Sequence, residues 1–266
     1  MKKFFSNTYL CIILCFLYAP IFLVILFSFF NTSEFSFANG FSFESYSQIF
    51  TSEKSAVLME ALKNTLIIAI VSSIVSTLLG TVASIGIFNL KRKTRRMVEA
   101  VNQLPVINSE VVMAVSLMVF FVTFGFPEGY PRLIIAHIAF CTPYVVLAVM
   151  PKLAQMDSNI YEAALDLGAT PIKATTKVLL PYLAPGILSG FIMAFTISLD
   201  DFIITQINKG ASTGIDTLST YIYSDARVKG LEPFWLAVFS IIFVVVLAVL
   251  LVANLKKSTK NVEKKI

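Results

Sequence analysis

Long apolar runs, separated by short polar segments, recur along the whole chain. They lie at about residues 8–30, 64–88, 104–124, 132–151, 185–207 and 233–255. Each run approaches or exceeds the ~20 residues that a helix needs to cross the hydrocarbon core of a bilayer. Because lipid offers the backbone no hydrogen-bond partners and the runs are too long for barrel strands, we expect helices. The pattern predicts an all-α membrane protein whose six transmembrane helices form a single domain over residues 1–266.

The composition agrees with a chain that is solvated by lipid. Of the 266 residues, 57% are hydrophobic and only 14% are charged, and the mean hydropathy is +0.81. A soluble domain needs a largely polar surface, so this balance excludes one. The net charge of +5 does not indicate nucleic-acid binding, because the basic residues cluster between the apolar runs, where lipid headgroups lie.

The orientation follows from the lysines and arginines in the connections. With both termini in the cytoplasm, 15 of these residues lie on the cytoplasmic side and 6 on the outer side, which accounts for all 21. Cytoplasmic loops of membrane proteins carry an excess of basic residues. We therefore expect a multi-pass protein of the bacterial inner membrane with both ends of the chain in the cytoplasm.

The cytoplasmic connection over about residues 152–184 is long enough to hold structure of its own. Ile160, Ala164 and Leu167 recur at helical spacing and form an apolar stripe. Gly168 can adopt the left-handed backbone conformation that ends a helix. We therefore expect a short helix that stops at Gly168.

A second helix is expected to begin directly after this turn. Thr170 is a suitable N-cap, and Pro171 occupies the first helical position, which proline favours. Pro181 and Pro185 lack the backbone N–H that a helix interior needs. We expect these two prolines to break the chain before the fifth span.

The same connection resembles the signature loop of permeases from ATP-binding cassette importers. That signature consists of Glu-Ala-Ala, three residues, Gly, nine residues, a hydrophobic residue, any residue and Leu-Pro. The matching residues are Glu162, Ala163, Ala164, Gly168, Val178, Leu180 and Pro181. The resemblance implies the type I importer permease fold, in which this loop forms a coupling helix that docks on a separate ATPase.

The resemblance also implies which partners the chain needs. The sequence has no G-x-x-x-x-G-K-[ST] phosphate loop, so ATP hydrolysis is expected from another polypeptide, and the chain itself is not an enzyme. A second permease and a periplasmic or surface binding protein are implied, and no cofactor is. One histidine and no cluster of metal-ligating residues leave little chemistry for the alternative of a membrane enzyme.

Two adjacent carboxylates, Asp200 and Asp201, interrupt the fifth apolar run. Ionisable groups inside a span are costly and usually mark a transport pathway. On a continuous helix Ser198 and Thr205 share a face with Asp201, and the run contains no lysine or arginine that could neutralise the pair. We expect these four residues to line a substrate path that carries a cation.

The segment Ser198-Leu199-Asp200-Asp201-Phe202 is similar to the Ser-x-Asp-Asp-Phe stretch of spermidine/putrescine importer permeases, specifically the second of their two dissimilar permeases. The resemblance implies a polyamine substrate, with spermidine and putrescine both open. A permease for another small solute is the alternative, and a stand-alone channel or carrier would have no use for the signature loop. The aspartates also have structural alternatives, since they can cap a helix end or bond to the partner permease.

Two further polar residues lie in the apolar runs. Glu110 comes near the start of the third run, and we expect it to cap that helix. His137, the lone histidine, lies in the fourth run. We expect a packed histidine whose hydrogen bonds are satisfied, with a proton relay as the alternative.

Overall fold

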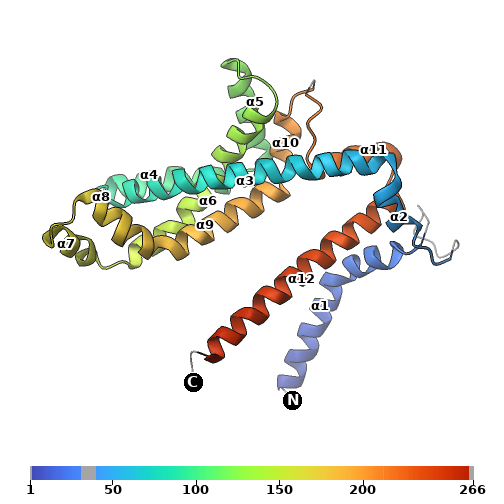
Figure 1. Ribbon diagram of the computed structural model, residues 1–266, viewed down its shortest axis with the longest axis horizontal. Helices are drawn as coiled ribbons and strands as arrows, with labels where there is room; N and C mark the ends of the chain where they lie inside the picture. Colours follow the sequence, from blue (N-terminus) through green and yellow to red (C-terminus); the bar gives the residue numbers. More distant parts are fainter. Residues whose placement is uncertain (1, 31–39, 212, 264–266) are drawn as a thin grey trace. The chain divides into compact units, whose positions relative to one another are not determined.

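The computed structural model describes the chain apart from residues 1, 31–39, 212 and 264–266, and its side chains apart from these and residues 2–7, 158 and 249–263 (Figure 1). Apart from one isolated bridge between Phe30 and Phe41, the regular structure of the described residues is helical. The helices are α1 (Lys2–Phe27), α2 (Glu44–Thr51), α3 (Glu53–Phe88), α4 (Arg92–Ile107), α5 (Glu110–Thr123), α6 (Tyr130–Gln155), α7 (Ser158–Asp166), α8 (Pro171–Ala174), the π-helix η1 (Thr175–Leu179), α9 (Leu180–Asp200), α10 (Ile203–Asn208), α11 (Leu218–Lys229) and α12 (Pro233–Glu263).

Four stretches of helix in the described part of the chain are long and apolar enough to cross a membrane. They are Thr8–Phe27, Glu53–Phe88, Tyr130–Gln155 and Pro171–Asp200. The bent pair of α4 and α5 provides a fifth candidate, and Pro233–Ala248 is a shorter apolar segment at the start of α12. Each of the six expected runs therefore overlaps a helix, while the count of six complete spans stays a prediction.

The third expected run, residues 104–124, is not one straight helix. Its first residues belong to α4, and the chain turns by 103° between α4 and α5. Asn108 and Ser109 lie at this corner with extended backbones, ψ 156° and 137°. The break therefore lies inside the expected run, at consecutive polar residues that the reading as one span passed over.

The fifth expected run begins earlier and is continuous across its prolines. Helical structure extends from Pro171 through η1 to Asp200, so the predicted break at Pro181 and Pro185 is wrong. The N–H of Leu180 donates to the carbonyl of Thr175, five residues back, which is the π-helical pattern. This wider turn lies directly before Pro181 and lets the helix pass through a position where a normal helical bond cannot form.

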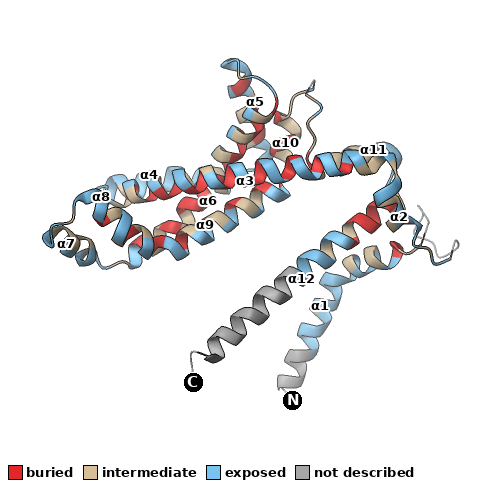
Figure 2. Ribbon diagram, in the orientation of Figure 1, coloured by how far each residue is buried: buried red, intermediate tan, exposed pale blue. Residues whose placement is uncertain are grey.

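The chain divides into two compact units, residues 60–221 and residues 1–59 with 222–266. In the first unit α6 packs against α9, and α5 packs against α10 (Figure 1). Buried positions follow α6 along its length, as Figure 2 shows. A Cβ added to Gly80 of α3 would lie 2.7 Å from the side chain of Val145 in α6, and one added to Gly190 of α9 would lie 3.0 Å from the same side chain. Glycine at both positions therefore lets α3 and α9 approach α6 closely.

The second unit holds an ionic network at the start of α3. The ammonium of Lys54 lies 2.7 Å from Asp225 and also pairs with Glu232. The indole N–H of Trp235 donates to the same Asp225 carboxylate at 2.7 Å. Burial alone would raise the pKa of Asp225, but the hydrogen bonds from Lys54 and Trp235 outweigh it and lower that pKa below its ordinary value. The network fixes the start of α3 to α11 and α12 within this unit.

Candidate functional site: the turn of the signature loop and a broken helix

The turn after α7 is built as the sequence predicts. Gly168 has φ +83°, the left-handed conformation that glycine adopts without strain. The N–H of Gly168 donates to the carbonyl of Leu165 at 2.9 Å, and the N–H of Ala169 donates to that of Ala164 at 3.1 Å. These two bonds form a Schellman motif, which satisfies the last carbonyls of the helix. The expectation that Gly168 ends a short helix is confirmed.

The next helix starts three residues later, also as expected. The Thr170 hydroxyl accepts a bond from the N–H of Lys173 at 3.4 Å, and Pro171 occupies the first turn. From there the chain continues through η1 into the long helix α9. The turn at Gly168 is thereby connected through continuous helical structure, from Pro171 onward, to the pair of aspartates at its far end.

The apolar side chains around this turn point away from the protein. Leu167 is 89% exposed and Ile172 is 77% exposed, and Ile160 is exposed as well. Of the expected stripe, Ala164 alone is half-buried, so the stripe does not pack on the rest of the chain as an amphipathic helix usually does. Glu162 and Ala163 of the signature are exposed too. Large exposed apolar side chains that surround a polar signature indicate a surface that another protein covers.

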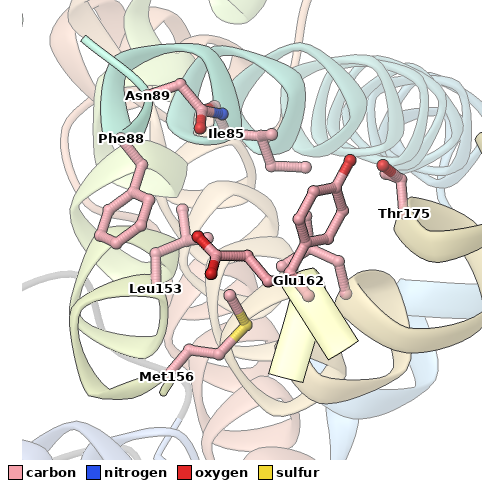
Figure 3. Close-up of a pocket in the computed structure, with 9 residues that line it drawn as sticks. Ile85, Phe88, Asn89, Leu153, Met156, Glu162 and Thr175 are labelled. Atoms are coloured by element: carbon pink, nitrogen blue, oxygen red, sulfur yellow. The ribbon is translucent and has the colours of Figure 1, made fainter. Parts of the chain in front are cut away.

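A pocket of about 190 Å³, which the exposed Glu162 also borders, lies against α7 (Figure 3). Its walls come from the end of α3, the end of α6, α7 and η1. Glu162 and Tyr161 contribute the α7 side, and Phe88, Leu153 and Leu179 contribute apolar walls. Sequence reasoning missed this pocket because its walls come from four separate elements.

Asp201 ends α9 and caps the next helix. Its backbone is extended, with ψ 133°, so the helix stops there and restarts at Ile203. One carboxylate oxygen accepts the N–H of Ile204 at 3.0 Å, and the other accepts the N–H of Thr205 at 2.8 Å. The Thr205 hydroxyl donates to the second oxygen at 2.8 Å. Asp201 therefore satisfies the free N–H groups at the start of α10, the role of a capping carboxylate.

His137 of α6 joins this cap to α9. Its Nδ1 lies 2.7 Å from the Ser198 hydroxyl, and its Nε2 lies 3.1 Å from the Thr205 hydroxyl and 3.5 Å from Asp201. Because the Thr205 hydroxyl already donates to Asp201, it accepts from Nε2–H, and Ser198 donates to Nδ1. Hydrogen bonds therefore run from Ser198 through His137 and Thr205 to Asp201, and all four side chains are buried. The expectation of a packed, satisfied histidine agrees with this geometry.

Asp200 lies in a different environment from its neighbour. Its side chain is exposed, and none of the ion pairs among the described residues includes it. Thr196, one turn earlier, and Leu199 are exposed as well. Of the four residues expected on the substrate path, Ser198, Asp201 and Thr205 gather around His137 inside the protein. Only Asp200 is open to a solute.

Other polar residues act in packing at the end of this region. Glu110 is the first residue of α5, where its negative charge interacts favourably with the helix dipole, but the N-cap position is Ser109 and no side chain makes a capping hydrogen bond there. Asn208, which sequence reasoning passed over, is fully buried. Its amide donates to the carbonyls of Ala114 at 3.1 Å and Ile204 at 3.0 Å, which ties α10 to α5. A polar residue just beyond an apolar run was the available signal.

Comparison with known proteins agrees with these features. Residues 76–261 match the family described as "Binding-protein-dependent transport system inner membrane component". The chain is 30% identical to the spermidine/putrescine transport system permease protein PotC of Haemophilus influenzae, over 98% of this chain and all of that protein. It is 32% identical to the putrescine transport system permease protein PotI of Escherichia coli, over 82% of this chain and 78% of that protein.

Solved structures share the fold. A chain of a bacterial ABC transporter that imports the acidic polysaccharide alginate superposes with a TM-score of 0.72 at 21% identity. That comparison covers 95% of this chain and 94% of the other. The chain therefore has the permease fold of ATP-binding cassette importers and belongs to the family of binding-protein-dependent transport system inner membrane components.

Proposed function

We propose that this chain, a permease subunit and not an enzyme, forms the membrane path of an importer for polyamines such as spermidine and putrescine. The observation that carries the substrate class is the exposed carboxylate of Asp200 at the end of α9, which belongs to none of the ion pairs among the described residues. Relatives over nearly the whole chain are named for spermidine and putrescine, which supports the same class. A polyamine carries separated ammonium groups, and a carboxylate can replace part of the water that each one loses.

The two aspartates then have separate tasks. Asp200 faces the path and contacts an ammonium group, while Asp201 holds the break between α9 and α10 in place. Ser198, Thr205 and His137 support Asp201 from behind through the hydrogen bonds described above. This arrangement keeps one carboxylate available to the solute, while the other accepts hydrogen bonds from two backbone N–H groups and the Thr205 hydroxyl.

The coupling surface is formed by Leu167, Ile172 and the exposed part of the signature, Glu162 and Ala163. It contacts a separate cytoplasmic ATPase, and Ala164, Gly168 and Pro181 shape the segment behind it. A second permease completes the path, and a binding protein outside the membrane delivers the solute. Closure of the ATPase subunits moves the turn, and the continuous helix from Pro171 to Asp200 carries the motion to the aspartates.

The coupling role is tested by replacing Gly168 with valine. A β-branched residue is strained at φ +83°, although nothing lies within 4 Å of the added Cβ, so the effect is confined to the turn. We expect the permease to reach the membrane at normal abundance, while polyamine uptake and binding-protein-stimulated ATP hydrolysis fall together. The measurement is ATPase activity and uptake of the assembled transporter in proteoliposomes.

Gly168→Asn is the matched control, because asparagine tolerates the left-handed conformation far better than valine. It should retain most of the coupled activity. Equal, normal activity in both variants contradicts the coupling assignment. A different result contradicts the substrate class alone. In that case the binding protein stimulates ATP hydrolysis normally when it carries another solute, but gives no stimulation when it carries spermidine or putrescine.

The proposed orientation places both termini and the start of α4 in the cytoplasm. In a variant whose Cys11, Cys15 and Cys141 are replaced by alanine, a single cysteine is introduced at Thr94 or at Ala211, both exposed. We expect a membrane-impermeant maleimide to label Ala211→Cys in spheroplasts and Thr94→Cys only after permeabilisation. The opposite pattern of labelling contradicts the orientation read from the basic residues.

A further inference from the structure

The start of α4 carries a concentrated positive charge that neither the coupling segment nor the substrate path uses. Five of the six residues from Lys91 to Arg96 are lysine or arginine. Arg92, Lys93 and Arg96 are exposed, and no ion pair among the described residues includes any of them. A cluster of unpaired cations on the surface of a membrane protein is a site for an anion.

One member of this cluster is held rigidly. The Nε of Arg95 lies 2.8 Å from the Glu99 carboxylate, and its guanidinium lies 4.5 Å from the centre of the Phe88 ring. Both contacts orient the planar group from the side of α3 and α4. Arg92 and Arg96, one turn apart, lie on the neighbouring face and remain free.

These side chains surround a concave site. A cavity of about 430 Å³ is lined by Leu90, Arg92, Arg95, Arg96 and Glu99, a group that we call the α4 cradle. Three guanidinium groups face a single carboxylate, which Arg95 already pairs with, so the cradle has an excess of positive charge. Guanidinium groups bind phosphate through two parallel hydrogen bonds each, which makes a phosphate group the best-fitting anion.

The same helix exposes apolar side chains on a different face from the cradle. Met97, Val101 and Leu104 recur at i, i+4 and i+7 and are 71%, 56% and 61% exposed. No residue of α4 is buried in the structure. A helix with a basic face and an exposed apolar face is typical of segments that lie in the plane of the membrane interface.

We infer that the α4 cradle binds the phosphodiester headgroup of an anionic phospholipid, while Met97, Val101 and Leu104 hold the helix in the interface by lying against the acyl chains of the same leaflet. A free phosphate fits the guanidinium groups but leaves the apolar stripe uncovered. A zwitterionic lipid covers the stripe but brings its own cation to the cradle. An anionic lipid matches both, and this assignment is independent of the transported solute and of the ATPase contact.

Lipid binding by the purified full-length chain tests the inference. The protein in neutral detergent is titrated with phosphatidylglycerol or phosphatidylcholine, and bound lipid is counted by native mass spectrometry. We expect phosphatidylglycerol to bind at least about tenfold more tightly, because each basic residue near a membrane surface favours anionic lipid. The double variant Arg92→Gln/Arg96→Gln should lose this preference.

Lys63→Gln/Arg227→Gln is the matched control, since both residues are exposed and outside any ion pair among the described residues. This control also removes two positive charges, but at other sites, and it should keep the preference for phosphatidylglycerol. Equal losses in the two double variants overturn the site and leave only non-specific charge attraction. A second experiment adds inorganic phosphate, or chloride at the same ionic strength, to the protein with bound phosphatidylglycerol. If phosphate releases all of the lipid and chloride releases none, the ligand is a free phosphate and the inference is overturned.

Discussion

Asp200→Asn is expected to lower the uptake of radiolabelled spermidine or putrescine by about tenfold or more. The change keeps the size and hydrogen-bonding capacity of the side chain and removes only its charge. A tenfold loss corresponds to about 1.4 kcal/mol of lost stabilisation for the ammonium group on its way through the path. Because Asp200 is exposed and none of the described ion pairs includes it, membrane abundance and thermal stability should stay at the wild-type level.

The control for this variant is Glu60→Gln, which removes an exposed carboxylate on α3 instead. Its uptake should match the wild type. The assay is carried out in cells that lack other polyamine importers, with the amount of permease in the membrane measured on the same samples. If Asp200→Asn transports polyamines at the wild-type rate with normal abundance, Asp200 does not contact the solute, and the proposed substrate class loses its support from the structure.

Asp201→Ala is expected to fail at folding and not at transport alone. The change strands the N–H groups of Ile204 and Thr205, and it removes the acceptor of the Thr205 hydroxyl, all in a buried place. A buried polar group without a partner costs roughly 1–3 kcal/mol. Three such groups amount to a large part of the roughly 5–15 kcal/mol by which a protein is stable. The permease should be scarce in the membrane, and its midpoint of thermal unfolding in detergent should drop by many degrees.

Asp201→Asn separates this role from a contact with solute. Asparagine retains one acceptor oxygen, so the unfolding midpoint should lie between those of the wild type and Asp201→Ala. Uptake, corrected for the amount of folded permease, should stay close to the wild-type value in Asp201→Asn. A corrected uptake as low as that of Asp200→Asn, at a normal unfolding midpoint, would mean that both carboxylates face the path.

The turn of the signature loop was predictable because its determinants lie close together in the sequence. The turn at Gly168 and the cap at Thr170 depend on bonds between residues no more than five positions apart. Such bonds follow from residue type and spacing alone. The prolines show the limit of that reasoning. Pro181 reads as a helix breaker, yet a widened turn before it keeps the helix continuous.

The fate of the acidic pair was not predictable from spacing. On an unbroken helix Ser198, Asp201 and Thr205 form one stripe, and the sequence suggested that this stripe faces water. In the structure the stripe faces His137, whose partners Ser198 and Thr205 are 61 and 68 residues away in the chain. Which side of a transmembrane helix turns inward is decided by packing with distant helices, and an apolar run has no period that reveals it.

The π-turn at Thr175–Leu179 also sets a rotational register between the two ends of its helix. Each residue of an α-helix turns the chain by about 100°, so one extra residue in a turn offsets everything beyond it by that angle. Ile172, on the coupling side, and Asp200, at the path, therefore owe their relative azimuth to this one turn. Converting the wide turn to ordinary α-helical turns would rotate Ile172 against Asp200 by about that angle. Moving it elsewhere between them would instead change only the direction of the residues that it passes. The relation between the two ends of the 30-residue helix therefore persists only while one wide turn lies between them.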